Sequence, residues 1–291
     1  MKTVILITGP TASGKTSLAL QAAKHYNTEI ISADSRQCFK EMSIGVAKPA
    51  DEELASVPHH FINSHSIHEE VNAATFARYA HAAAEKIFEN HDVLILVGGT
   101  GLYIKAFLEG LDAIPEIPGD VRAEILSDYE SRGLVWLQRE VEVADPKFFA
   151  EGEIQNPQRL MRALEVVRGT GKSIRYYQKG RSEGAMDKYD VKKFAIDIPR
   201  ERLYENINLR VESMIEDGLV DEVMVLAPYR HLNALQTVGY SELFEHFDGL
   251  ISIDEAVEKI KKNTRHYAKR QMTWFRKDAD IVWINALHQL L

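Results

Sequence analysis

The sequence contains a single cysteine, Cys38, among 291 residues. One cysteine excludes an internal disulfide framework and a zinc ribbon, and it favours the cytosol. Long apolar runs are missing too, because no stretch approaches the roughly 20 residues that span a bilayer, and the N-terminus has no signal-peptide pattern. The apolar content of 45% and charged content of 27% are typical of a soluble globular protein. We therefore expect a cytoplasmic protein without a membrane partner.

Basic residues are outnumbered, with 35 Lys and Arg against 43 Asp and Glu and a formal net charge of −8. Two segments depart from this balance. Residues 158–181 contain seven Lys or Arg and one Glu, and residues 259–277 contain eight Lys or Arg and no acid, which leaves −22 on the rest of the chain. This distribution predicts a local polyanion site with a repulsive surround. Two solvated helix faces would give the same pattern.

Apolar runs alternate with helical patterns in the first hundred residues. The runs "TVILITG", "EIISAD" and "DVLILVGG" are separated by helical patterns at 16–26 and 72–90. Strands separated by helices of this length predict an α/β fold with a parallel sheet and helices on both faces. Ligands of such sheets bind at the carboxyl ends of the strands, so residues 9–16, Asp34 and residues 98–101 should converge.

A proline-rich segment at 113–118, "AIPEIP", predicts a linker. Beyond it, strand signals stop until "KKFAIDI" near 192–198. We expect a first core part at 1–114, an inserted small helical domain at 115–191 and a second, mostly helical core part at 192–291, with edges placed to within about ten residues. The last long helix should begin at a capping box formed by Ser252 and Glu255.

The segment "GPTASGKT" follows the first apolar run and has the spacing of a phosphate-binding loop. Its backbone N–H groups would surround a diphosphate, Lys15 would contact the phosphates, and the Thr16 hydroxyl would bind Mg²⁺. The core should therefore resemble the P-loop nucleotide kinases. The residues expected to bind the diphosphate are Gly9, Pro10, Thr11, Ala12, Ser13, Gly14, Lys15 and Thr16.

An acidic Mg²⁺ ligand is missing after "VLILV", which ends in glycines, although P-loop hydrolases and kinases normally carry an acid there. Asp34, in "ISADSRQ", is the acid placed at a strand end near the loop. Small-molecule kinases use such an acid to contact the acceptor, so Asp34 is the leading candidate for a general base. A turn or helix N-cap is the alternative role.

Several separated motifs resemble those of the bacterial tRNA dimethylallyltransferases, in the same order and over nearly the whole chain. They are "GPTASGKT", "ADSRQCFKEMSIGVAKP", "VPHHFIN", "GGTGLYIKAFLEGL", "NPQRLMRALEVVRGTGKS", "TVGYSEL" and "TRHYAKRQMTWFRK". The resemblance implies transfer of a dimethylallyl group from dimethylallyl diphosphate to N6 of adenosine 37, beside the anticodon of tRNA. It also implies Mg²⁺ as cofactor. We expect a monomer that needs no other protein and binds the anticodon stem-loop.

The resemblance also assigns residues to tRNA contact. These are Asp34, Ser35, Arg36, Gln37, Thr100, Arg122, Gln158, Arg159, Leu160, Met161 and Arg162. From the second basic segment we add Lys261, Lys262 and Arg265, which should neutralise RNA phosphates. Cys38, Phe39 and Val46 depart from the usual family residues and should affect the shape of the pocket. A cysteine among apolar residues is predicted to be buried and inert.

Arg210 lies on an apolar helical stripe with Leu203, Ile207, Val211 and Met214. A guanidinium that faces inward needs an anion, because a buried unpaired charge is costly. The donor diphosphate and a buried structural carboxylate are both candidates. His59 and His60 are not expected to bind a metal, since adjacent residues in a turn point apart.

Three other functions are compatible with parts of the sequence. A P-loop kinase of a nucleotide or small alcohol would explain the loop and Asp34, but not the basic segments. A non-catalytic RNA-binding protein would leave Lys15 and Thr16 without a role. A relative that prenylates free adenine nucleotides would not need two basic segments.

Overall fold

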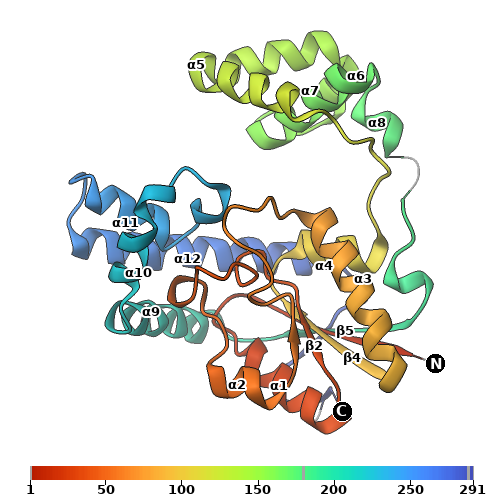
Figure 1. The fold of residues 1–291 in the computed structure, drawn as a ribbon, viewed down its shortest axis with the longest axis vertical. Coiled ribbons are helices and arrows are strands. Elements are labelled where there is room, and N and C mark those ends of the chain that lie inside the picture. Colours follow the sequence, from red (N-terminus) through yellow and green to blue (C-terminus); the bar gives the residue numbers. More distant parts are fainter. Residues whose placement is uncertain (1, 179–180, 287–288, 291) are drawn as a thin grey trace. The chain divides into compact units, whose positions relative to one another are not determined.

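The computed structural model of the chain describes residues 2–178, 181–286 and 289–290 (Figure 1). It divides into two compact units. The larger comprises Met1–Leu108 and Gly184–Leu291, and the smaller comprises Glu109–Glu183. The edges of the insertion were expected at 115 and 191 from the sequence, whereas the structural units meet at 108/109 and 183/184.

The larger unit contains a six-stranded parallel sheet with the order β3-β2-β4-β1-β5-β6. Its strands are β1 (Thr3–Thr8), β2 (Ile30–Ser32), β3 (His59–His60), β4 (Val93–Gly98), β5 (Asp190–Ile196) and β6 (Val282–Ile284). Neither β3 nor β6 is among the strands predicted from the sequence, whereas β2, which is as short as β6, falls within the predicted run "EIISAD". The expectation that His59 and His60 occupy a turn is wrong, since they form β3.

Helices cover both faces of the sheet, as expected from the alternation of strands and helices (Figure 1). One face presents Val4, Leu6, Leu94 and Leu96 to α3 (Ala73–Asn90) and α4 (Gly101–Glu109). The neighbouring residues on the same strands point the other way, because successive side chains of a strand alternate. Ile5, Ile7, Ile95 and Val97 pack on α1 (Lys15–Tyr26).

The C-terminal half of the larger unit is mostly helical, as expected. It contains α9 (Arg200–Glu216), α10 (Leu219–Leu226), α11 (Tyr240–Phe247) and α12 (Ile253–Phe275), which pack on one another beside the sheet (Figure 1). The predicted capping box of α12 is confirmed, because Ser252 Oγ accepts a hydrogen bond from Glu255 N and Glu255 Oε2 accepts one from Ser252 N. Between β2 and β3 lie the short helices η1 (Ile44–Val46) and α2 (Asp51–Ser56).

The smaller unit is a helical bundle with its own apolar core. It contains α5 (Gly119–Ala144), α6 (Pro146–Glu151), α7 (Pro157–Thr170) and α8 (Ile174–Tyr177), and α5 is kinked at Gly133, where φ is 73°. Its two ends are joined, since Ser182 N donates to Leu111 O at 2.8 Å and Asp112 forms an antiparallel bridge with Arg181. Among the helices of the described ranges, none combines the length and apolarity needed to cross a membrane.

Candidate active site

The phosphate-binding loop connects the buried strand β1 to the first turn of α1. Two of its glycines have backbone angles that side chains disfavour, with φ of 141° at Gly9 and 90° at Gly14. Lys15 folds back over the loop and its Nζ donates to Pro10 O at 2.6 Å. Ser13 Oγ is shielded from solvent and has no hydrogen-bond partner among the described residues. The loop therefore has polar groups available for a ligand.

The Lys15 ammonium lies in an environment that disfavours its charge. Its pKa is lowered from 10.5 to about 7, chiefly by burial and then by the nearby Arg210 guanidinium, while the Asp34 carboxylate acts in the opposite direction. An anion placed against Lys15 would reverse this shift. The electrostatics of the loop are therefore suited to a ligand that brings negative charge.

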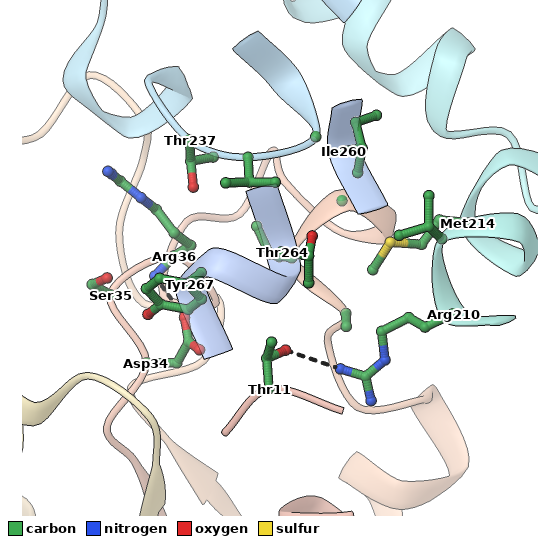
Figure 2. Close-up of a pocket in the computed structure, with 16 residues that line it drawn as sticks. Thr11, Asp34, Ser35, Arg36, Arg210, Met214, Thr237, Ile260, Thr264 and Tyr267 are labelled. Atoms are coloured by element: carbon green, nitrogen blue, oxygen red, sulfur yellow. Dashed lines mark hydrogen bonds between the residues drawn. The ribbon is translucent and has the colours of Figure 1, made fainter. Parts of the chain in front are cut away.

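Arg210 reaches the phosphate-binding loop from α9. Its Nη1 donates to Thr11 Oγ1 at 3.3 Å (Figure 2), and burial lowers its pKa. Within the described ranges no carboxylate oxygen lies within 4.0 Å of the guanidinium, so the buried structural carboxylate considered above is absent there. The structure thus brings two cations, Lys15 and Arg210, to one loop, and the residues it describes supply no carboxylate for Arg210.

Asp34 follows β2 at the carboxyl edge of the sheet. Its Oδ1 accepts hydrogen bonds from Arg36 N at 2.8 Å and Gln37 N at 3.2 Å, so the carboxylate does stabilise a turn. Its Oδ2 has no hydrogen bond to any described residue. The turn and the proposed base are compatible, because they use different oxygens. Figure 2 shows Asp34 and Arg210 on opposite sides of Thr11.

Two adjoining cavities meet at these residues. The first, of about 220 Å³, has an apolar part formed by Val46, Val211, Met214, Val238 and Ile260. The second, of about 360 Å³, is lined by the loop residues Gly14, Lys15 and Thr16. Both are lined by Thr11, Asp34, Val46, Ala47, Arg210 and Tyr267. The site therefore joins a polar end at the phosphate-binding loop to an apolar end near α9 and α12.

The residues beside Asp34 are held in place by the protein itself. Thr100 Oγ1 accepts a hydrogen bond from Ser35 N at 3.1 Å, and Arg36 Nη1 donates to Asn233 O at 3.0 Å. Gln37 Nε2 donates to Ala47 O at 2.9 Å and to Val46 O at 3.2 Å. Asp34, Ser35 and Arg36 all line the first cavity. The structure thus brings the predicted residues 34–37 and Thr100 together.

The other predicted RNA-contact residues from the family motifs lie in the smaller unit. Arg122 and Arg162 both bind the buried Glu165 carboxylate, at 3.0 and 2.7 Å. Leu160 and Met161 are buried in the core of this unit, with side chains 0% and 5% exposed. The expectation that these two side chains contact RNA is therefore corrected, since they pack inside the bundle. Gln158 and Arg159 are exposed.

The second basic segment, residues 259–277, comprises most of α12 and the two residues after it. Glutamates form ion pairs with part of its positive charge. Lys261 pairs with Glu212 and Glu258, each at 2.9 Å, and Arg265 donates to Asn208 Oδ1 at 2.7 Å. Lys262 is exposed. A charge count along the chain could not reveal the pair of Lys261 with Glu212, because Glu212 lies 49 residues earlier.

Gln271 and Tyr267 on α12 belong to the site but were not predicted from the sequence. The buried Gln271 accepts a hydrogen bond from Thr11 N at 2.8 Å and donates to Gly99 O at 3.0 Å, so it joins the phosphate-binding loop to the end of β4. Tyr267 lines both cavities, and burial followed by the Asp34 charge raises its pKa to about 12. Ile260, Thr264, Tyr267 and Gln271 are spaced by four, three and four residues, so they lie on one face of α12. This spacing can be read in the sequence and could have predicted that face.

Comparisons with known proteins agree with this geometry. A family model described as IPP transferase matches residues 37–278. The tRNA dimethylallyltransferase of Cytophaga hutchinsonii is 45% identical over 284 residues, which cover 98% of this chain and 93% of the relative. That of Christiangramia forsetii is also 45% identical, over 96% of this chain and 92% of the relative.

Solved structures give the same result. The tRNA isopentenylpyrophosphate transferase of Bacillus halodurans is 35% identical with a TM-score of 0.72, covering 98% of this chain and 90% of that one. A eukaryotic dimethylallyltransferase acting on tRNA has a TM-score of 0.78 and 25% identity, covering 99% of this chain and 75% of that one. The predicted α/β fold with a phosphate-binding loop is thereby confirmed.

Proposed function

The chain belongs to the IPP transferase family, and we propose that it transfers the dimethylallyl group of dimethylallyl diphosphate to N6 of adenosine 37 in tRNA. The observation that carries this proposal is the convergence of a phosphate-binding loop, Arg210 and Asp34 on one site with an apolar end. A diphosphate and a short branched hydrocarbon need such a combination. We place the reaction in the cytoplasm.

The diphosphate would bind at the polar end. Backbone N–H groups of the loop, Lys15 and Arg210 would neutralise it, and Ser13 Oγ would gain the partner that the described residues do not supply. The dimethylallyl group would lie against Val46, Met214 and Ile260 in the apolar part. As the allylic C–O bond breaks, negative charge grows on the diphosphate, and these cations stabilise it most in the transition state.

The residues of the loop fit Mg²⁺, because this ion prefers a few oxygen ligands together with phosphate oxygens and water. Thr16 would supply its hydroxyl, as expected from the sequence. Within the described chain no group of three or more His, Cys, Asp or Glu could hold a metal alone, which suits an ion held mainly through substrate phosphates. When bound, Mg²⁺ would supply further charge neutralisation to the diphosphate.

The acceptor base would enter beside Asp34. Adenine N6 attacks the allylic carbon, an N–C bond forms, the C–O bond breaks and diphosphate leaves. One proton of N6 passes to Asp34, whose Oδ2 is available while Oδ1 remains bound to two backbone N–H groups. The base must leave the anticodon-loop stack to reach this position.

The test is incubation of the protein with labelled dimethylallyl diphosphate, Mg²⁺ and unmodified tRNA, without any added nucleotide, followed by nucleoside analysis. Label should appear as N6-(dimethylallyl)adenosine at position 37, and tRNA with guanosine 37 should accept none. Parallel reactions with AMP and ATP as acceptors would detect a transferase of free nucleotides. An absolute requirement for ATP, or transfer of its γ-phosphate, would replace the proposal with a kinase.

A further inference from the structure

Glu222 of α10 binds the segment that forms one wall of the first cavity. Its Oε2 accepts hydrogen bonds from Ser43 N at 3.0 Å and Ile44 N at 2.7 Å. Its Oε1 accepts from Gly45 N at 3.0 Å and from the Tyr240 hydroxyl at 2.5 Å. A carboxylate has about four acceptor positions, and here all four are occupied.

The wall segment, residues 43–47, cannot hold this conformation through regular secondary structure. Its helix η1 has three residues, and Ala47 adopts a left-handed φ of 48°. Three consecutive N–H groups point to one side and would lack partners without Glu222. The Tyr240 ring also packs directly against Gly45, because a Cβ on Gly45 would lie 2.5 Å from this ring. The Tyr240 side chain is fully buried, and burial raises its pKa.

The opposite side of the wall segment is connected to Asp34. Gln37 donates from its side chain to Val46 O and Ala47 O, and from its backbone to Asp34 Oδ1. Gly45, Val46 and Ala47 then line the cavity together with Asp34 and Arg210. A continuous set of hydrogen bonds therefore runs from Glu222 through the wall to the proposed base.

We propose that Glu222 and Tyr240 are positioning residues that fix the width of the apolar end of the site and thereby restrict the donor to a five-carbon chain. This inference rests on the proposed function. The facing wall is built from Val211 and Met214 on α9 and Ile260 on α12, which are parts of long packed helices. The 43–47 wall is irregular and is not part of a long helix, so it would move if its anchor were weakened.

Two variants weaken the anchor to different degrees. Glu222→Gln keeps the side-chain volume but replaces one carboxylate oxygen by an NH₂ group, which faces either Gly45 N or the Ser43 and Ile44 N–H groups and should displace the wall. Tyr240→Phe keeps the ring over Gly45 and removes one hydrogen bond only. Asp221→Asn, an exposed carboxylate one position earlier on α10, serves as the matched control.

The experiment measures kcat and KM with dimethylallyl and geranyl diphosphate, on the same tRNA, for the wild type and the three variants. Glu222→Gln should raise the KM for the five-carbon donor about tenfold, reduce the preference for it over the ten-carbon donor about tenfold, and leave the KM for tRNA within about twofold. Tyr240→Phe should shift both donor parameters in the same direction by a smaller factor. Asp221→Asn should resemble the wild type.

An unchanged donor preference in folded Glu222→Gln and Tyr240→Phe would overturn the inference, and so would an equal loss with both donors. If Glu222→Gln does not fold, Tyr240→Phe decides alone, since it leaves all three backbone bonds of Glu222 in place. Failure of the wild type to transfer from dimethylallyl diphosphate would instead contradict the proposed function. The two failures are therefore distinguishable.

Discussion

At the scale of single residues, the charge of Lys15 depends on what is bound. With its pKa lowered to about 7, the amine is about half neutral at neutral pH when no anion is present. A diphosphate would favour the ammonium and raise this pKa, so binding above pH 7 should take up a proton. Between pH 7 and 9 donor affinity should then fall by up to about tenfold per pH unit.

Calorimetry in two buffers of different ionisation enthalpy measures this proton uptake directly. Lys15→Met is the matched control, since it reports the protons contributed by the donor and by all other groups. Equal proton uptake in wild type and Lys15→Met would show that Lys15 does not titrate on binding.

Asp34 has two functions that can be separated by substitution. In Asp34→Asn the amide oxygen can still accept from Arg36 N and Gln37 N, so the turn should persist while the base is lost. Asp34→Ala removes both. We expect Asp34→Asn to lower the single-turnover rate by about 10²–10⁴-fold at saturating donor and tRNA, with donor affinity within a few-fold of wild type. If Asp34→Asn transfers at the wild-type rate and Asp34→Ala transfers slowly, Asp34 stabilises the turn and is not the general base.

Arg210 should act on the donor and not on tRNA. Its guanidinium lies beside Thr11, and no carboxylate of the described residues forms an ion pair with it. Arg210→Gln would therefore remove a positive charge that we expect to bind the diphosphate. We expect a raised KM for the donor, an unchanged Kd for tRNA and a higher pKa for Lys15, because Arg210 lowers that pKa. Proton uptake should consequently begin at higher pH in this variant. A parallel loss of tRNA affinity would contradict the assignment.

At the scale of elements, sequence patterns predict what local periodicity determines. The strands β1, β2, β4 and β5 follow from apolar runs, the helix α3 from helical spacing and the cap of α12 from a capping box. The strands β3 and β6 do not, since their pairing is decided by neighbours far away in sequence. The site shows the same division. The loop and Asp34 can be predicted from local motifs, whereas the hydrogen bonds of Gln271, and those of Glu222 to residues 43–45, join segments more than 170 residues apart in sequence.

The helix α12 carries two classes of basic residue. Lys261 is bound by two glutamates, whereas Lys262, Lys269 and Arg270 are exposed and form no ion pair with a described residue. Replacing these three by Gln should weaken tRNA binding and flatten its salt dependence by about 0.7–0.9 in slope for each RNA phosphate that is no longer neutralised. Lys261→Gln should leave the slope unchanged. Filter binding at several salt concentrations measures the tRNA affinity and its salt dependence. Equal slopes in the wild type and all variants would show that RNA phosphates do not contact these residues of α12.

At the scale of the whole molecule, the donor site and part of the predicted RNA surface belong to different units. Every residue that lines the two cavities lies in 1–108 or 184–291, whereas Arg122, Gln158, Arg159 and Arg162 lie in the insertion. The proline-rich segment predicts that such an insertion exists. Its edges depend on which residues pack together, and this cannot be read from composition.

This division predicts that donor binding does not need the smaller unit. Leu111 and Ser182 lie side by side, so residues 112–181 can be replaced by a short Gly/Ser turn with little strain on the larger unit. The shortened protein should bind dimethylallyl diphosphate within a few-fold of the full chain by calorimetry. It should lose most tRNA affinity, because the arginines of the insertion are removed. The basic residues of α12 remain and should give weak residual binding. A folded deletion protein that no longer binds the donor would show that the smaller unit completes the site, and retained tRNA affinity would restrict RNA recognition to the larger unit.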